Sequence, residues 1–143
     1  MRTITVSIDL PRPITSVWSE LATLERHTGW MVDVEHMEFV GERRSGVGTE
    51  MRVRTRVGPI VTEDDITVDE WVEPRLIAVS HGGRISGTGS FILEEIESGT
   101  RFTWNEELRF PWYLGGVLAG LGARPVLRRI WRRNLERFAA VLA

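Results

Sequence analysis

The sequence predicts an α+β fold: an antiparallel sheet of about seven strands, two short helices after the first strand and one long helix at the end. Three observations support this prediction. Residues 3–10 alternate between apolar and polar, alternating segments joined by turn residues fill positions 34–110, and an amphipathic stretch closes the chain. Strands that are followed by a separate helix are typical of α+β folds. The length of 143 residues fits one domain, residues 1–143.

The first strand is predicted at Thr3–Leu10, where every second residue is apolar and would face the interior. Pro11 and Pro13 end this strand, and a proline is well tolerated in the first turn of a helix. Apolar residues then recur at helical spacing up to Ala22, which predicts a short helix. A second short helical stretch is expected at Leu24–Thr28.

Six more strands are expected, separated by turn residues. Their predicted ranges are 34–41, 49–57, 60–72, 76–81, 84–96 and 100–110. The inward face is unclear for the first and fourth of these. In the strand 60–72 a bulge is expected near Glu63–Asp65, with Asp64 and Asp65 on a solvated edge. Gly87 and Gly89 lie inside a predicted strand, where glycine often marks a bulge or a sharp bend.

The strand at 49–57 has the clearest alternation. Met51, Val53 and Thr55 are expected to point inward. Arg52, Arg54 and Arg56 are then expected to point outward, because a shift of one residue would bury three guanidinium groups.

The last element is a helix expected from about Pro125 to Leu142. At 100° per residue its apolar positions form one broad face. That face comprises Leu127, Ile130, Trp131, Asn134, Leu135, Phe138, Val141 and Leu142. Leu127, Trp131, Phe138 and Leu142 are expected to be largely buried against the sheet.

Composition excludes several classes of chemistry. The chain has no cysteine, which excludes disulfides, thiolate nucleophiles and cysteine-bound metals. All 18 basic residues are arginine, so a phosphate-loop lysine and Schiff-base chemistry are excluded as well. The net charge of −2 gives no sign of nucleic-acid binding. With no apolar run of about 18 residues and no signal-peptide pattern, a cytoplasmic protein without a transmembrane segment is expected; the oligomeric state stays open.

Several short motifs, in this order and spacing, resemble the START-like (SRPBCC) superfamily, most closely its polyketide cyclase/dehydrase-like subfamily. The opening strand and proline at Val6–Pro11 are followed by the Val17-Trp18 pair, and Trp30 follows the second helix. Gly46–Thr49 is similar to the turn into the third strand, and Ser98–Trp104 to the turn into the last strand. The resemblance covers essentially the whole chain.

The resemblance implies a helix-grip fold, in which a curved sheet wraps around the C-terminal helix and leaves a cavity for apolar or aromatic molecules. It implies no single reaction, because the superfamily includes both lipid carriers and aromatase/cyclases. No cofactor is expected. Residues 112–122 are apolar and contain four glycines. Glycine lowers helix stability, so this stretch is expected near the cavity mouth, where a lid would lie.

Candidate site residues follow from the predicted faces. Glu106 shares a face with apolar neighbours, where a carboxylate costs desolvation free energy unless it is paired. Glu106, His81 and Asn134 are candidates for catalysis. The residues expected to bind a ligand are Trp104, Glu106, Leu108, Asn134, Trp30, Phe102 and Trp131. Each polar candidate has a structural alternative, such as a solvated strand end for Glu106 and a satisfied core hydrogen bond for Asn134.

His27, His36 and His81 have no spacing suited to a metal ion, so no metal site is expected. His27 and His81 could each lie at a cavity rim or in a solvated turn.

Three functions stay open at this stage. The first is a carrier that binds or sequesters a lipid-like or polyketide-like small molecule. The second is a polyketide cyclase, aromatase or dehydratase in which Glu106 transfers protons together with Asn134 or His81. The third is an interaction protein that uses its C-terminal helix, because residues 124–137 contain six arginines and one glutamate.

Overall fold

The computed structural model describes residues 3–83, 86–109 and 116–143. Seven strands and three helices follow one another along these residues. They are β1 (Thr3–Leu10), α1 (Ile14–Leu21), the 3₁₀ helix η1 (Leu24–Gly29), β2 (Val34–Val40), β3 (Glu50–Val57), β4 (Ile60–Val72), β5 (Leu76–Gly83), β6 (Ser86–Ile96), β7 (Gly99–Arg109) and α2 (Gly116–Leu142). The α+β prediction is confirmed.

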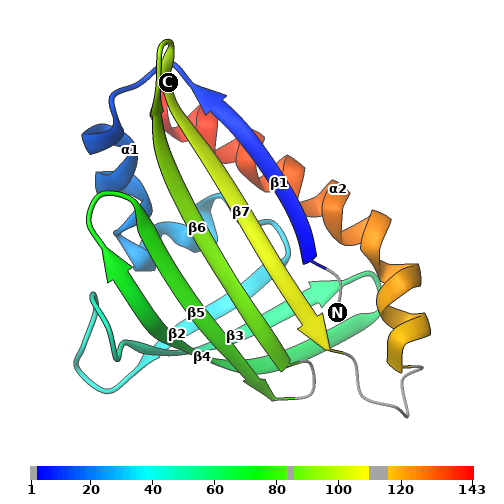
Figure 1. The fold of residues 1–143 in the computed structure, drawn as a ribbon. Coiled ribbons are helices and arrows are strands. Elements are labelled where there is room, and N and C mark those ends of the chain that lie inside the picture. The colour runs from blue at the N-terminus through cyan, green and yellow to red at the C-terminus, as the bar shows by residue number, and fades with distance from the viewer. Residues whose placement is uncertain (1–2, 84–85, 110–115) are drawn as a thin grey trace.

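The strands form one antiparallel sheet in the order β1-β7-β6-β5-β4-β3-β2. The sheet curves around α2, which packs on β1 and β7, whereas α1 contacts β6 and β7 and η1 contacts β2 (Figure 1). This is the helix-grip arrangement. Among the described helices, none combines the length and the apolar character needed to cross a membrane.

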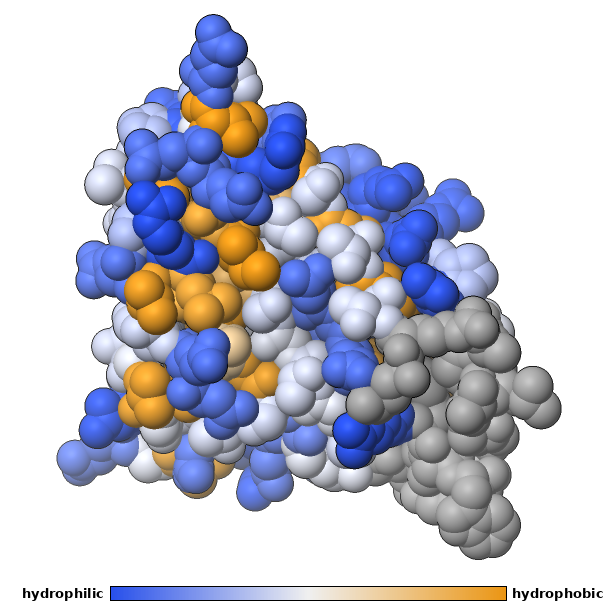
Figure 2. Space-filling model, viewed as in Figure 1, coloured by the Kyte–Doolittle hydropathy of each residue, from blue (hydrophilic) through white to orange (hydrophobic). Residues whose placement is uncertain are grey.

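The two faces of the sheet differ as the alternation predicts. On β1 and β3 the residues Ile4, Val6, Met51 and Val53 are buried, whereas Arg52, Arg54 and Arg56 are exposed. Figure 2 shows hydrophilic side chains mixed with side chains of intermediate hydropathy on the side toward the viewer, with apolar side chains gathered on the left. The exposed arginines are neutralised by carboxylates. Their ion pairs are Arg52–Asp65, Arg54–Glu35 and Arg56–Glu35.

The C-terminal helix begins earlier than expected. α2 starts at Gly116, and Pro125 lies inside it. A proline removes one backbone hydrogen bond but does not by itself end a helix that is packed against a sheet. Trp131 and Phe138 are buried, as expected, whereas Leu127 and Leu142 are only partly buried. Val141 is 42% exposed and lies outside the packed face.

Two expectations for the long strands are wrong. The pairing of β4 with β5 is irregular between Val68 and Glu70, not near Glu63–Asp65. β6 pairs with β7 without a register shift through Gly87 and Gly89, so neither glycine marks a bulge. A Cβ at Gly87 would lie 1.9 Å from the carbonyl oxygen of Glu107. Gly87 therefore permits a close approach of two backbones.

Candidate functional site

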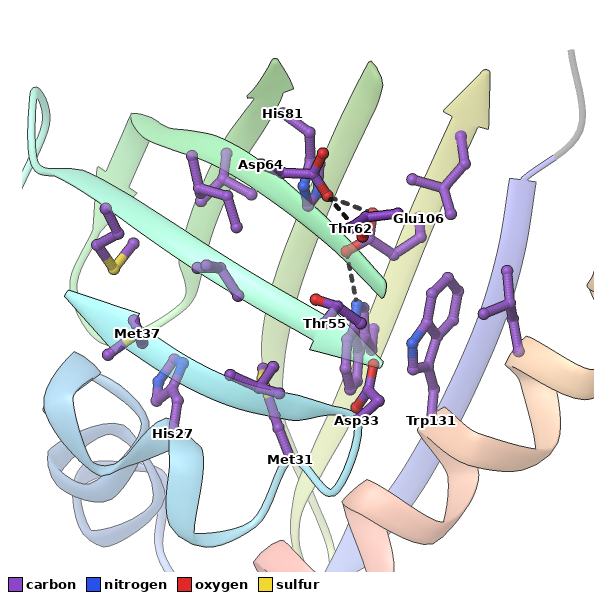
Figure 3. Close-up of a pocket in the computed structure, with 18 of the residues that line it drawn as sticks. His27, Met31, Asp33, Met37, Thr55, Thr62, Asp64, His81, Glu106 and Trp131 are labelled. Carbon is purple, nitrogen blue, oxygen red and sulfur yellow. Dashed lines mark hydrogen bonds and ion pairs between the residues drawn. The ribbon is translucent and has the colours of Figure 1, made fainter. Parts of the chain in front are cut away.

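A cavity of about 230 Å³ lies between the concave face of the sheet and α2. Strands β2 to β7 line it on one side, and η1, the loop after it and α2 close the other side. One water molecule needs about 10–15 Å³ of such space, so the cavity is far larger than a packing defect. Its walls are largely apolar. Figure 3 shows Met31 and Met37 on the side of the cavity away from Glu106.

Aromatic side chains form part of the cavity wall and the core behind it. Trp104 on β7 and Trp131 on α2 line the cavity, and their rings stack at 5.2 Å between centroids. Trp30, which is 1% exposed, lies behind this wall and makes an edge contact with Trp104. Phe102 is fully buried beside Trp30. Stacked and edge-to-face rings of this kind add stability beyond their buried area.

Glu106 is the centre of a hydrogen-bonded network that faces the cavity. Its Oε1 accepts a hydrogen bond from the indole Nε1 of Trp104 at 3.1 Å, and its Oε2 lies 3.1 Å from Nε2 of His81. Because a carboxylate only accepts, Nε2 of His81 carries the proton in this contact. The side chains of His81 and Glu106 are 14% and 8% exposed. Each Glu106 oxygen therefore has a partner and still has a lone pair for a ligand.

A glycine on the strand between them allows Glu106 to reach His81. His81 is on β5, Glu106 is on β7, and Gly89 on β6 is the direct partner of Glu106 in the β6–β7 register. A Cβ at Gly89 would lie 2.6 Å from Oε1 of Glu106, far too close for two unbonded atoms. The missing side chain at Gly89 is what leaves room for the Glu106 carboxylate.

Negative charge gathers around His81. Burial lowers the pKa of His81, but the hydrogen bond and charge of Glu106 and the charge of Asp64 outweigh burial and raise that pKa above 6.5. Asp64 lines the same cavity, and Figure 3 shows it next to His81 and Glu106. The hydroxyl of Thr62 lies 3.5 Å from Oδ2 of Asp64.

Asp64 corrects the prediction that Asp64 and Asp65 both lie on a solvated edge. Only Asp65 is on the outer face, where it pairs with Arg52. Asp64 is half-buried and faces the cavity, because it shares the inward positions of β4 with Thr62 and Ile66. The alternation of β4 indicates this position, because Asp64 lies an even number of residues from the buried Val68 and so shares its inward face.

His27 lies in a different electrostatic environment of the same cavity. It is 6% exposed and its Nε2 donates a hydrogen bond to the carbonyl oxygen of Leu21 at 2.7 Å. Burial lowers its pKa to about 4, and the hydrogen bond to Leu21 and the charge of Glu25 offset only part of this effect. His27 is therefore neutral at pH 7, and its pKa is shifted in the opposite direction to that of His81.

Asn134 has both ends of its amide engaged within the chain. Its Oδ1 accepts a hydrogen bond from the backbone N–H of Val32, and its Nδ2 donates to Oδ1 of Asp33 at 2.8 Å. Asn134 is fully buried and is not among the residues that line the cavity. These bonds fix the loop after η1 to α2. A role for Asn134 in ligand binding or catalysis stays a prediction.

Asp33, held by Asn134, is itself a cavity residue that the sequence did not indicate. Burial raises the pKa of Asp33, and the nearby negative charge of Glu106 adds to this effect. Hydrogen bonds from Asn134 and Trp131 act in the opposite direction but do not cancel it.

The structure thus brings some of the predicted site residues together and not others. Trp104, Glu106, Leu108, Trp131 and His81 line one cavity. Trp30 and Phe102 lie behind its wall, and Asn134 lies beside it. The stretch at 112–122, expected at the mouth, falls outside the residues whose side chains the structure describes, except that Gly122 is exposed. In the described part of the chain, no three side chains of the types that bind metals form a group that could hold a metal ion.

The outer face of α2 carries the arginines noted in the sequence. Arg128, Arg129, Arg132 and Arg133 are exposed, and none of the four makes an ion pair or hydrogen bond with another described residue. A partner for this face stays a prediction.

Solved structures share this fold over nearly the full length. A protein from Bacillus halodurans, BH1534, has 17% identical residues and a TM-score of 0.75, covering 100% of this chain and 98% of its own. TTHA0849 from Thermus thermophilus has 17% identity and a TM-score of 0.73, covering 99% and 94%. CV1439 from Chromobacterium violaceum has 15% identity and a TM-score of 0.70, covering 99% and 98%. At these identities the likeness concerns the fold alone.

The sequence itself also matches a known family. The family model described as polyketide cyclase/dehydrase and lipid transport matches residues 1–143. No curated protein matches the sequence. Because the match spans the whole chain, and the curved sheet around α2 is the fold that the resemblance implied, the chain belongs to the polyketide cyclase/dehydrase and lipid transport family.

Proposed function

We propose that this protein binds an apolar or aromatic small molecule between the sheet and α2, as a carrier or sequestering protein. The observation that supports this most directly is the cavity of about 230 Å³ with largely apolar walls and a small polar group around Glu106. Binding sites for small molecules combine these two features: apolar walls supply affinity, and a few polar groups fix orientation. Family membership supports the same class of ligand.

A neutral apolar dye, N-phenyl-1-naphthylamine, tests this proposal. Its fluorescence should rise on binding to the purified protein. The variant Val53→Phe, which places a larger side chain at the cavity wall, should weaken binding at least ten-fold. The matched control is Val72→Phe, because Val72 is 53% exposed and lies outside the cavity. If the dye does not bind, or both variants bind like the original protein, the proposal is wrong. Native mass spectrometry of the same preparation would reveal a ligand that co-purifies.

An enzyme is the second candidate, and the pair His81–Glu106 favours it. Two titratable groups 3.1 Å apart at the edge of one cavity are what general acid–base chemistry needs. Glu106 would take a proton from a carbon next to a carbonyl group, and the imidazolium of His81 would supply one to the carbonyl oxygen. Cyclisation and dehydration of polyketide-like chains use such proton transfers.

Deuterium exchange separates the two candidates. With 2-tetralone in D₂O, an enzyme of this kind should speed up exchange of the protons next to the carbonyl, as measured by NMR. Glu106→Gln keeps the side-chain shape and should abolish this acceleration while dye binding continues. A carrier should show no acceleration in either form and only a modest change in affinity for the dye.

A further inference from the structure

Three acidic side chains contribute most of the charged groups in the described lining of the cavity. Asp33, Asp64 and Glu106 come from the loop before β2, from β4 and from β7, yet all three line the same cavity. The basic residues among the described lining residues are His27, which is neutral at pH 7, and His81, whose pKa is raised. The sequence contains no lysine. The described lining thus carries more acidic than basic groups.

These groups act on one another across the interior. Burial and the charge of Glu106 both raise the pKa of Asp33. The charges of Glu106 and Asp64 help to raise the pKa of His81 against the effect of its burial. Like charges in a cavity of low dielectric repel, and a positive charge placed among them would relieve that repulsion. A further negative charge would increase it.

The rest of the cavity wall, opposite the acidic side chains, is apolar. Figure 3 shows Asp64 and Glu106 pointing toward one another on one side and Met31 and Met37 on the other. Methionine is flexible and polarizable, so it fits its shape to varied apolar groups. The cavity therefore has an adaptable apolar part and an acidic part, and its occupant should have two matching parts.

We infer that the occupant is an apolar or aromatic amine, whose ammonium group lies among Asp33, Asp64 and Glu106. This inference rests on the proposed small-molecule binding and specifies its ligand class. An ammonium group has three donors and no acceptor, which matches carboxylate oxygens that only accept. Charge-assisted hydrogen bonds of this kind are about twice as strong as neutral ones. A carboxylate on the same apolar body would be repelled by these acids and should bind less tightly.

Three probes with one apolar body test the inference: 2-naphthylmethylamine, 2-naphthylmethanol and 2-naphthoate. Isothermal titration calorimetry at pH 7 should show the amine binding at least ten-fold more tightly than the carboxylate, with the alcohol between them. The variant Asp64→Asn should reduce this preference at least five-fold. Asp65→Asn is the matched control, because it removes the same charge one residue away on the outer face. That variant should keep the preference, and circular dichroism checks that both variants are folded.

The possible outcomes separate this inference from the proposed function. If the alcohol binds but the amine gains nothing over the carboxylate, the inference is wrong and small-molecule binding stands. If Asp65→Asn lowers the preference as much as Asp64→Asn, the selectivity comes from overall charge and the inference is again wrong. If none of the three probes binds, the proposed function fails and this inference fails with it.

Discussion

Two sets of buried polar groups lie near the cavity and differ in where their hydrogen bonds end. Asn134 and His27 use their hydrogen bonds to hold nearby segments in place. Asn134 binds the N–H of Val32 and the carboxyl group of Asp33, and His27 binds the carbonyl of Leu21. Glu106 and His81 bond to each other, and both also line the cavity. The first set holds loops and helices in place, whereas the second has capacity left for a ligand. Burial alone therefore does not distinguish a structural polar group from a functional one. What distinguishes them is whether the group has lone pairs or donors that no other residue uses.

Removing Asn134 should have the largest effect on stability. Asn134→Leu takes the hydrogen-bond partner from the N–H of Val32 and from the half-buried carboxyl group of Asp33, and it leaves no polar group at a fully buried position. The expected cost is about 3–5 kcal/mol in the free energy of unfolding. Urea unfolding measures this. The control Asn105→Ala removes only an exposed bond to Thr5 and should cost under about 1 kcal/mol. Similar losses in both variants would contradict a structural role that is particular to Asn134.

The pH dependence of stability should come next. The pKa of His27 is about 4 in the folded chain and 6.5 in an unfolded one, so the unfolded chain binds more protons between these values. Stability therefore falls as pH drops from about 6.5 to 4, by about 3 kcal/mol from this residue. In His27→Gln the same fall should be smaller by that amount. Unfolding by urea at pH 7 and pH 4 tests this, and equal falls in both proteins would show that His27 is not the cause.

A methyl group at Gly89 should disturb Glu106 and His81 without affecting Asn134 and His27. Gly89→Ala forces the Glu106 carboxylate away and should cost about 1–3 kcal/mol. It should also lower the pKa of His81, which NMR titration measures and which a purely structural change elsewhere would not alter. Gly82→Ala is the control, because a Cβ there would lie an ordinary 3.9 Å from the nearest atom. An unchanged His81 pKa in Gly89→Ala would contradict the proposed spacing role.

The smallest effect is expected for the charge of Glu106. The raised pKa of His81 stabilises the fold at pH values below 6.5, and this contribution is lost as pH rises through the folded pKa. Its sign is opposite to that of His27. Glu106→Gln removes the cause, so the stability of the variant should no longer decline in this window. Urea unfolding between pH 6 and pH 9 tests the difference, and parallel profiles would show that Glu106 does not govern His81.

Local patterns predicted the fold well because each strand buries one face. The alternation at 49–57 placed Met51 and Val53 inward and the neighbouring arginines outward, as observed. The same rule places Asp64 inward, but two adjacent aspartates suggested a solvated edge. The predicted helix start at Pro125 is wrong, because the backbone angle that proline fixes suits the interior of a packed helix as well as its first turn.

The contacts that define the site could not be predicted in the same way. Glu106 meets His81 across an intervening strand, and only the register of β6 on β7 places Gly89 between them. Asn134 meets Asp33 from 101 positions away along the chain. Such contacts depend on how distant segments pack, whereas alternation reports only which face a residue occupies.

The place of the first strand in the sheet has a consequence for how the chain folds. β1 pairs with β7, so Thr3 lies opposite Glu107, although residues 11–98 separate the two strands along the chain. Pairing between distant segments is slow, because a long loop must close before any contact rewards it. We expect hairpins from β3 to β7 to form early and β1 to join last. Until then the apolar side chains of Ile4, Val6 and Leu10 stay uncovered, which makes β1 prone to aggregation while the chain folds.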